Sequence, residues 1–110
     1  MAEAATIKWP GKSGTEYTYW IYPIETTFSE VPGNYIFAKE TSPRNWSPVY
    51  IGQTKNLSDR LSDHEKEKCA KRNGATHIHA HKTDGGEAVR KAEEKDLITR
   101  WKPPCNEQLV

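Results

Sequence analysis

Clusters of glycine and proline divide this sequence into short segments, and the division limits the fold more than any other feature. Residues 6–9 and 16–22 are rich in aromatic and β-branched side chains, and Pro10-Gly-Lys-Ser-Gly14 separates them. Such a pattern is typical of a β-hairpin. Pro23 follows the second segment directly. We therefore predict that the chain begins with a hairpin that ends near Pro23.

Two further segments, residues 34–38 and 49–51, have strand-like composition and precede a change of pattern. From Asn56 to about Arg72 no proline or glycine interrupts the chain until Gly74. Asparagine is a favoured N-cap residue, and an Asn-Gly pair commonly ends a helix. The segment therefore predicts one helix.

Residues 75–82 alternate His77, His79 and His81 with smaller side chains, which predicts a strand. A second helix is expected from about Glu87 to Trp101, because Pro103 and Pro104 cannot continue it.

The order of the expected elements predicts an α/β fold of the α+β kind, in which helices flank a small antiparallel sheet. A chain of 110 residues is long enough for one compact domain. We expect residues 1–32 to form an N-terminal β-hairpin extension and residues 33–110 to form the main body of that domain.

Composition excludes several classes of protein but does not identify a function. The formal net charge is +1, so the chain as a whole lacks the strong basic charge of many nucleic-acid-binding domains. No apolar run is long enough to span a membrane, and we expect no membrane partner. Two cysteines are too few for a disulfide framework, which makes the cytoplasm the default location.

Two helical positions suggest chemistry. Glu94 shares a helix face with Ile98 and Trp101, and a carboxylate on an apolar face is costly without a partner. It could be a metal ligand, or it could sit at an exposed edge or pair with Lys91 or Arg90. Arg60 and His64 stand four residues apart on the first expected helix and should project together. Alone, that pair is typical of a solvated edge.

The spacing of the whole set resembles the GIY-YIG nuclease family over residues 33–106. The resemblance is carried, in order, by Gly33-Asn-Tyr35, Val49-Tyr-Ile-Gly52, the passage from Gly52 to Arg60-Leu61 with His64 one turn later, Glu94-Lys-Asp-Leu-Ile98, and Lys102-Pro-Pro-Cys-Asn106. Each piece is short, but all five occur in order.

The resemblance implies a metal-dependent endonuclease that hydrolyses phosphodiester bonds in nucleic acid, with DNA as the expected polymer. It implies that Glu94 anchors one Mg²⁺ or Mn²⁺ ion and that Arg60 bridges phosphate oxygens. Tyr35 or Tyr50 would act as general base, and the sequence does not choose between them. His64 would accept or relay the proton. Asn106 would fix the geometry around Glu94 or the two tyrosines.

Two residues depart from the family pattern. Asn34 replaces an apolar residue, but on a strand it should face away from Tyr35. Gln53 replaces a lysine that many members carry, which removes one phosphate contact. With the low net charge, Gln53 supports an alternative, a nucleic-acid-binding module without cleavage. A homodimer formed through the hairpin, or a partner protein that supplies specificity, is a further alternative. DNA against RNA, strandedness and sequence preference stay open.

Two other patterns are explained by ordinary structural roles. The three histidines of residues 77–81 could hold Zn²⁺ or Ni²⁺, but a polar, solvent-facing strand edge explains them as well. Basic residues of the helices are interleaved with acids and are expected on solvated faces, Arg90, Lys91 and Lys95 among them.

Overall fold

The computed structural model describes residues 5–62 and 64–106, so the ends of the two predicted regions, and position 63 of the first predicted helix, lie outside it. The strands are β1 (Thr6–Pro10), β2 (Glu16–Pro23), β3 (Gly33–Ser42), β4 (Asn45–Thr54) and β5 (His77–Lys82). The helices are α1 (Leu57–Ser62), α2 (Glu67–Arg72), α3 (Glu87–Trp101) and the 3₁₀ turn η1 (Pro104–Asn106).

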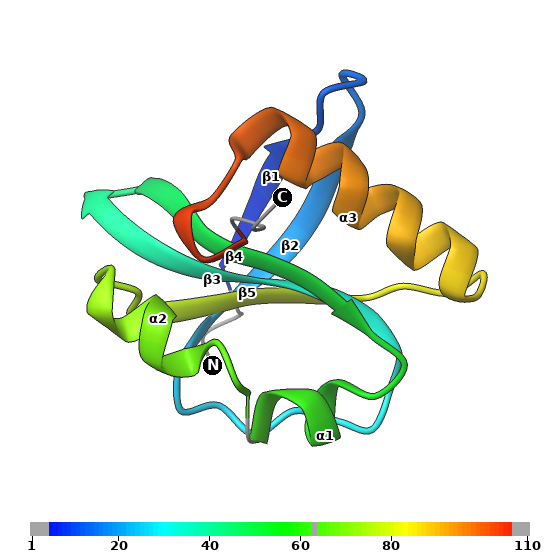
Figure 1. The fold of residues 1–110 in the computed structure, drawn as a ribbon, viewed down its shortest axis with the longest axis horizontal. Helices are drawn as coiled ribbons and strands as arrows, with labels where there is room; N and C mark the ends of the chain where they lie inside the picture. Colours follow the sequence, from blue (N-terminus) through cyan, green and yellow to red (C-terminus); the bar gives the residue numbers. More distant parts are fainter. Residues whose placement is uncertain (1–4, 63, 107–110) are drawn as a thin grey trace.

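The five strands form one antiparallel sheet in the order β1-β2-β5-β3-β4, with helices on both faces (Figure 1). This confirms the predicted α+β class, an antiparallel sheet flanked by helices. The predicted hairpin is β1 and β2, and it joins the sheet where Trp20 lies opposite Ala80 of β5. The division of the chain at residue 32 stays a prediction, although the hairpin and the later strands share this sheet.

Alternation along β3 separates two apolar cores. Tyr35 and Phe37 face α1 and α2, where they pack with Leu57 and Ala70. Ile36 faces α3 and packs with Leu97 and other buried side chains. Successive strand residues point to opposite faces of a sheet, so one strand contributes to both cores. The two apolar cores therefore lie on opposite faces of the sheet.

The first predicted helix is interrupted, which corrects the expectation of one helix from residue 56 to 72. Asn56 caps α1 as predicted, because its Oδ1 accepts a hydrogen bond from the backbone N–H of Asp59 at 3.1 Å. His64 lies between α1 and α2 and is 4% exposed. Its Nδ1 accepts a hydrogen bond from the backbone N–H of Lys66 at 2.9 Å. Side-chain bonds of this kind compete with helix continuation, and here the competition turns the imidazole into the core.

The expectation of a solvent-facing histidine edge is wrong, because β5 lies in the middle of the sheet. His79 is fully buried and its Nδ1 accepts a hydrogen bond from the indole of Trp9 at 2.9 Å. The side chain of Trp46 packs edge-on against the rings of His77 and His79. Within the described residues, no group of three or more His, Cys, Asp or Glu side chains could hold a metal ion.

Cys69 and Cys105 form a disulfide that joins α2 to η1, with 6.0 Å between their Cα atoms. This bond was not predicted from the sequence, because the number of cysteines carries no information about which segments pack together.

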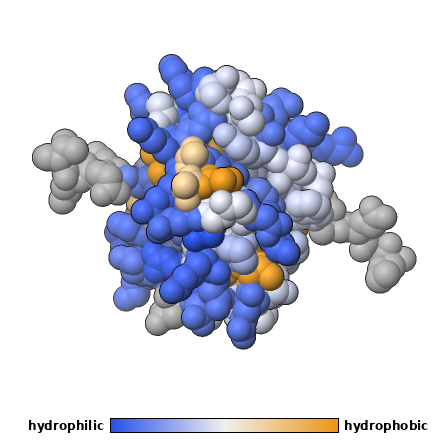
Figure 2. Space-filling view, turned by 90° about the vertical axis from the view of Figure 1, so that its right-hand side faces the viewer, coloured by the Kyte–Doolittle hydropathy of each residue, from blue (hydrophilic) through white to orange (hydrophobic). Residues whose placement is uncertain are grey.

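The face of the molecule in Figure 2 is largely hydrophilic, with only small apolar areas. Among the described helices, none is long and apolar enough to cross a membrane.

Candidate active site

Tyr35 and Tyr50 come together because β3 and β4 pair in a fixed register. Tyr35 lies opposite Gly52, and Phe37 lies opposite Tyr50. The ring of Tyr35 passes so close to Gly52 that a Cβ atom there would lie 2.5 Å from the phenol oxygen. The centroids of the two tyrosine rings are 6.2 Å apart. The missing side chain of Gly52 therefore makes room for the buried phenol.

His64 binds the phenol of Tyr35. Its Nε2 lies 2.6 Å from the phenol oxygen, and its ring also packs edge-on against Phe37 and Tyr50. Burial, with the nearby Arg60 charge, lowers the pKa of His64 to about 4. The imidazole is thus neutral near pH 7, and its Nδ1 already accepts the backbone N–H of Lys66. The remaining proton must sit on Nε2, so we assign His64 as the donor and Tyr35 as the acceptor.

Both phenols are neutral in this arrangement. Burial raises the pKa of Tyr35, and the neighbouring Tyr50 raises it further. Burial also raises the pKa of Tyr50, although that side chain is only half-buried. The guanidinium of Arg60 lowers both pKa values but does not outweigh burial. The guanidinium alone is therefore not enough to favour the phenolate form of either tyrosine.

Arg60 projects from α1 beside this aromatic cluster. Its Nη2 forms a 3.0 Å ion pair with Glu65, whose carboxylate is 70% exposed. Partial burial opposes its charge, but Glu65 and the two tyrosines raise the pKa of Arg60, so it stays cationic. Arg60 and His64 do approach the same cluster. They do so across the break between α1 and α2 rather than from one helix face.

Glu94 is a half-buried carboxylate on α3, a helix that packs mainly against β4. Burial raises its pKa, and the nearby Lys91 opposes that effect. Within the described chain Glu94 makes no hydrogen bond or ion pair. The two basic residues nearest to it on the helix have other partners: Lys91 pairs with Glu87, and Arg90 donates to Gln53. The negative charge of Glu94 contributes to the raised pKa values of both tyrosines. The carboxylate therefore lies within electrostatic reach of the phenols.

Asn106 binds the backbone of the residue next to Tyr50. Its Oδ1 accepts the backbone N–H of Ile51 at 2.5 Å, and its Nδ2 donates to the Ile51 carbonyl at 2.8 Å. Strand β4 is an edge strand, so these two backbone groups have no partner strand on that side. The amide of Asn106 supplies the missing pair of hydrogen bonds and holds η1 against the site.

The residues present fit a divalent cation held by one carboxylate. A half-buried carboxylate whose pKa is raised by burial has an unmet demand for positive charge. Mg²⁺ often binds through only one or two protein carboxylates, with water and substrate phosphate completing its coordination. Glu94 provides such a carboxylate within electrostatic reach of two phenols.

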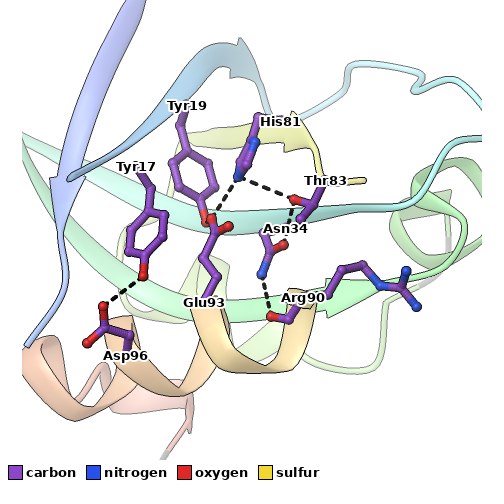
Figure 3. Close-up of polar contacts among 8 residues, drawn as sticks. All are labelled: Tyr17, Tyr19, Asn34, His81, Thr83, Arg90, Glu93 and Asp96. Carbon is purple, nitrogen blue, oxygen red and sulfur yellow. Dashed lines mark hydrogen bonds and ion pairs between the residues drawn. The ribbon is translucent and has the colours of Figure 1, made fainter. Parts of the chain in front are cut away.

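The opposite face of the sheet carries a separate buried polar network (Figure 3). Tyr19 donates to Glu93 at 2.6 Å, and His81 approaches the same carboxylate oxygen at 2.7 Å. Asn34 donates to the Arg90 carbonyl at 3.0 Å and accepts from the Thr83 hydroxyl at 2.7 Å. Asn34 therefore faces away from Tyr35, as predicted, and binds α3 to the sheet.

Arg90 was missed by the sequence analysis, which placed it on a solvated helix face. It is 8% exposed, and its Nε donates to Gln53 Oε1 at 3.0 Å. Glu65, the ion-pair partner of Arg60, was missed as well. The only sequence signal for Arg90 was its position four residues before Glu94.

Solved structures of one bacterial endonuclease domain are similar to this chain. The GIY-YIG N-terminal endonuclease domain of UvrC from Thermotoga maritima, bound to its catalytic divalent cation magnesium, is 29% identical, with a TM-score of 0.57. The match covers 72% of this chain and 86% of that one. A tyrosine-to-phenylalanine mutant of that domain, bound to its catalytic divalent cation, is 30% identical with the same TM-score, over 73% of this chain and 87% of that one. No family model and no curated protein sequence matches this chain.

Proposed function

Because the chain belongs to the GIY-YIG nuclease family, we propose that it is a metal-dependent endonuclease that hydrolyses phosphodiester bonds in nucleic acid, with DNA as the substrate. One observation carries the proposal. The half-buried carboxylate of Glu94 has no ion-pair partner in the described chain and lies within electrostatic reach of Tyr35 and Tyr50, which pack beside Arg60. Phosphodiester hydrolysis needs a cation site, a fixed positive group and a proton acceptor in one place.

Glu94 would hold the divalent cation, either Mg²⁺ or Mn²⁺. When bound, such an ion neutralises charge on the phosphoryl oxygens and lowers the pKa of bound water. The similar domain of UvrC binds magnesium as its catalytic cation, which supports this choice.

Arg60 would bind the phosphate through its planar guanidinium, which can contact two oxygens at once. Its present partner Glu65 is largely exposed, and exposed ion pairs contribute little free energy. A phosphate could therefore replace Glu65 at small cost. A lysine at position 60 would keep the charge but lose the two-point contact.

Tyr50 would be the general base. It is only half-buried, so its oxygen is the one better able to meet an attacking water, whereas Tyr35 is 1% exposed. As the water oxygen bonds to phosphorus, its proton would pass to the Tyr50 phenolate while the phosphorus bond to the leaving oxygen breaks. Arg60 favours that phenolate, as would a nearby divalent cation.

Tyr35 and His64 would position the phenol of Tyr50. The hydrogen bond from His64 Nε2 fixes the Tyr35 phenol beneath Tyr50. A neutral His64 that already donates from Nε2 is better suited to orient Tyr35 than to receive its proton. Asn106 would hold the backbone of Ile51, and so Tyr50, in place.

The test is cleavage of labelled single- and double-stranded DNA and RNA, in Mg²⁺ or Mn²⁺ and in EDTA. Glu94→Gln is expected to lower the rate about a hundredfold or more, because the cation anchor is lost. Glu87→Gln is the matched control on the exposed side of the same helix and should cut as wild type does. Equal rates for Glu94→Gln and wild type would contradict the proposal.

The same assay separates the two tyrosines. Tyr50→Phe should lower kcat by about a hundredfold or more, the range typical of a lost general base, and Tyr35→Phe should lower it less. The reverse order would assign the base to Tyr35.

A binding module without cleavage is the second candidate, favoured by the net charge of +1 and by glutamine at position 53. Folded wild-type protein that binds nucleic acid but does not cut it with either metal would select this alternative. The substrate panel also decides between DNA and RNA.

A further inference from the structure

Arg90 has an environment that its polar contacts do not account for. The side chain leaves α3 under the cover of neighbouring groups and is 8% exposed. Its only side-chain hydrogen bond within the described chain runs from Nε to Gln53 Oε1, at 3.0 Å. Gln53 is neutral, so this bond orients the guanidinium without neutralising it.

No carboxylate pairs with Arg90 among the described residues. Glu87, three residues earlier on the helix, pairs with Lys91 at 3.4 Å. Glu94, four residues later, makes no ion pair, and Lys91 rather than Arg90 is the cation that lowers its pKa. A buried charge without a counter-ion is costly. The site therefore favours an anion that the protein itself does not supply.

The end of the guanidinium keeps some contact with solvent. In the part of the chain that the structure describes, the only buried side-chain nitrogen or oxygen without a partner is Nε2 of His79. The two Nη atoms of Arg90 have no hydrogen-bond partner, so they must reach the surface. In Figure 3 the guanidinium extends away from the other labelled side chains. Arg90 thus has a buried stem, a fixed Nε and two free N–H₂ groups.

Helix spacing and chain connectivity place this end of Arg90 near the candidate active site. Residues four apart on a helix lie on the same face about 5–6 Å from each other, which places Arg90 one turn from Glu94. Its partner Gln53 directly follows Gly52, the residue that makes room for Tyr35. Strand β4 ends at Thr54 and leads into α1, which carries Arg60. Arg90 and Arg60 therefore flank the same end of β4.

We propose that Arg90 binds a phosphodiester group of the nucleic-acid backbone next to the one held at Glu94, with Gln53 fixing Nε so that both Nη atoms face the strand. The proposal rests on the proposed function for the class of ligand. It makes Gln53 an orienting residue, where the sequence analysis saw only the loss of a phosphate contact. A planar guanidinium held at Nε is suited to a two-point contact with phosphate.

The test is binding of a fluorescent DNA oligonucleotide in EDTA at several salt concentrations. Each neutralised phosphate adds about one unit to the slope of log K against log salt. Arg90→Gln should weaken binding about tenfold, the value of one charged hydrogen-bonded contact, and should lower that slope by about one unit.

Gln53→Glu tests the orienting contact with Arg90 still present. A carboxylate at position 53 would pair with Nε and neutralise the guanidinium, so weaker binding and a lower slope are expected again. Arg90→Lys keeps the charge but loses the bond to Gln53, and its affinity should be intermediate. Arg100→Gln is the control, because Arg100 lies about 15 Å further along α3, over the ring of Trp101. It should bind as wild type does.

The outcomes separate this proposal from the nuclease proposal. Thermal unfolding first identifies the variants that are folded, and if Arg90→Gln is not folded then Gln53→Glu decides. An unchanged slope in the folded variants, or no binding by wild type, overturns the role of Arg90. Wild type that cuts DNA while the variants bind normally removes this proposal alone. Wild type that binds through Arg90 but never cuts removes only the nuclease.

Discussion

At the scale of single residues, the candidate site depends on a pair whose members lie on neighbouring strands. Tyr35 can occupy its buried position only because position 52 has no side chain. Gly52 has no positive φ, so its role is to leave space rather than to allow an unusual backbone conformation. The absence of a side chain at Gly52 is thus explained by the space that the ring of Tyr35 needs.

Gly52→Ala should destabilise the protein by about 1–3 kcal/mol, the usual cost of overpacking a core, and should displace the Tyr35 phenol from His64. Urea unfolding measures the first effect and the cleavage assay the second. The matched variant is Gly52→Ala with Tyr35→Leu, in which the shorter side chain avoids the new methyl group. If the loss of unfolding free energy in the double variant equals the sum of the losses in the two single variants, Gly52 and Tyr35 are not coupled.

Motif order was enough to nominate Tyr35, Tyr50, Arg60, His64, Glu94 and Asn106, whose roles remain proposals. It could not give their contacts. Asn106 pairs with the backbone of Ile51, next to Tyr50, and this contact depends on the edge position of β4, which is a property of the whole sheet. Arg90 was overlooked for a similar reason, since its hydrogen-bond partner Gln53 is distant in sequence.

At the scale of elements, local pattern predicted all five strands by position, although β3 and β4 extend further than expected. Glycine, proline and β-branched residues act within a few positions, which is why the strand and helix order could be read directly. The break between α1 and α2 could not be predicted, because the gain comes from packing His64 against Tyr35 and Phe37. Helix propensity is easily overridden by such tertiary contacts.

The disulfide is the element-scale feature with the clearest consequence for stability. It closes a loop of 36 residues between α2 and η1. In the chain-entropy treatment, a loop of that length stabilises the folded state by about 3–4 kcal/mol. Reduction should therefore lower the free energy of unfolding by that amount, as measured by urea titration with and without reductant.

Reduction should also loosen η1, and amide hydrogen exchange at Ile51 should then become faster, because Asn106 protects that N–H. The variant carrying Cys69→Ala and Cys105→Ala should behave as the reduced protein in both measurements and should not respond to reductant. Equal stability of oxidised and reduced wild type would contradict a stapling role for the bond.

At the scale of the whole molecule, each face of the sheet buries a neutral histidine. Burial lowers the pKa of His64 to about 4 on the face of α1 and α2, with Arg60 adding to the effect. Burial, together with the nearby His77, lowers the pKa of His79 to about 3 on the other face. The acids Glu65 and Glu67 oppose the shift at His64 but do not cancel it. Both cores therefore require uncharged imidazole, and acid should weaken both at once.

The sign of the pH dependence follows from these two values. Above pH 6.5, the ordinary histidine pKa, both imidazoles are neutral in the folded and unfolded states and contribute nothing. Below it the unfolded chain binds protons that the folded protein excludes. The free energy of unfolding should then fall by about 1.4 kcal/mol per pH unit for each histidine. Urea unfolding between about pH 7 and pH 5 measures the slope of this free energy against pH. Ordinary carboxyl pKa values lie below about pH 5, so histidines dominate proton binding in this range.

His64→Gln should lower the total stability but remove about half of that pH dependence, because one of the two excluded protons is gone. His77→Gln is the control on β5, since His77 is only partly buried and should leave most of the slope in place. A flat profile for wild type over this range would mean that at least one core accepts a charged imidazole. It would also remove the basis for assigning the proton of His64 to Nε2, because that assignment requires the neutral ring.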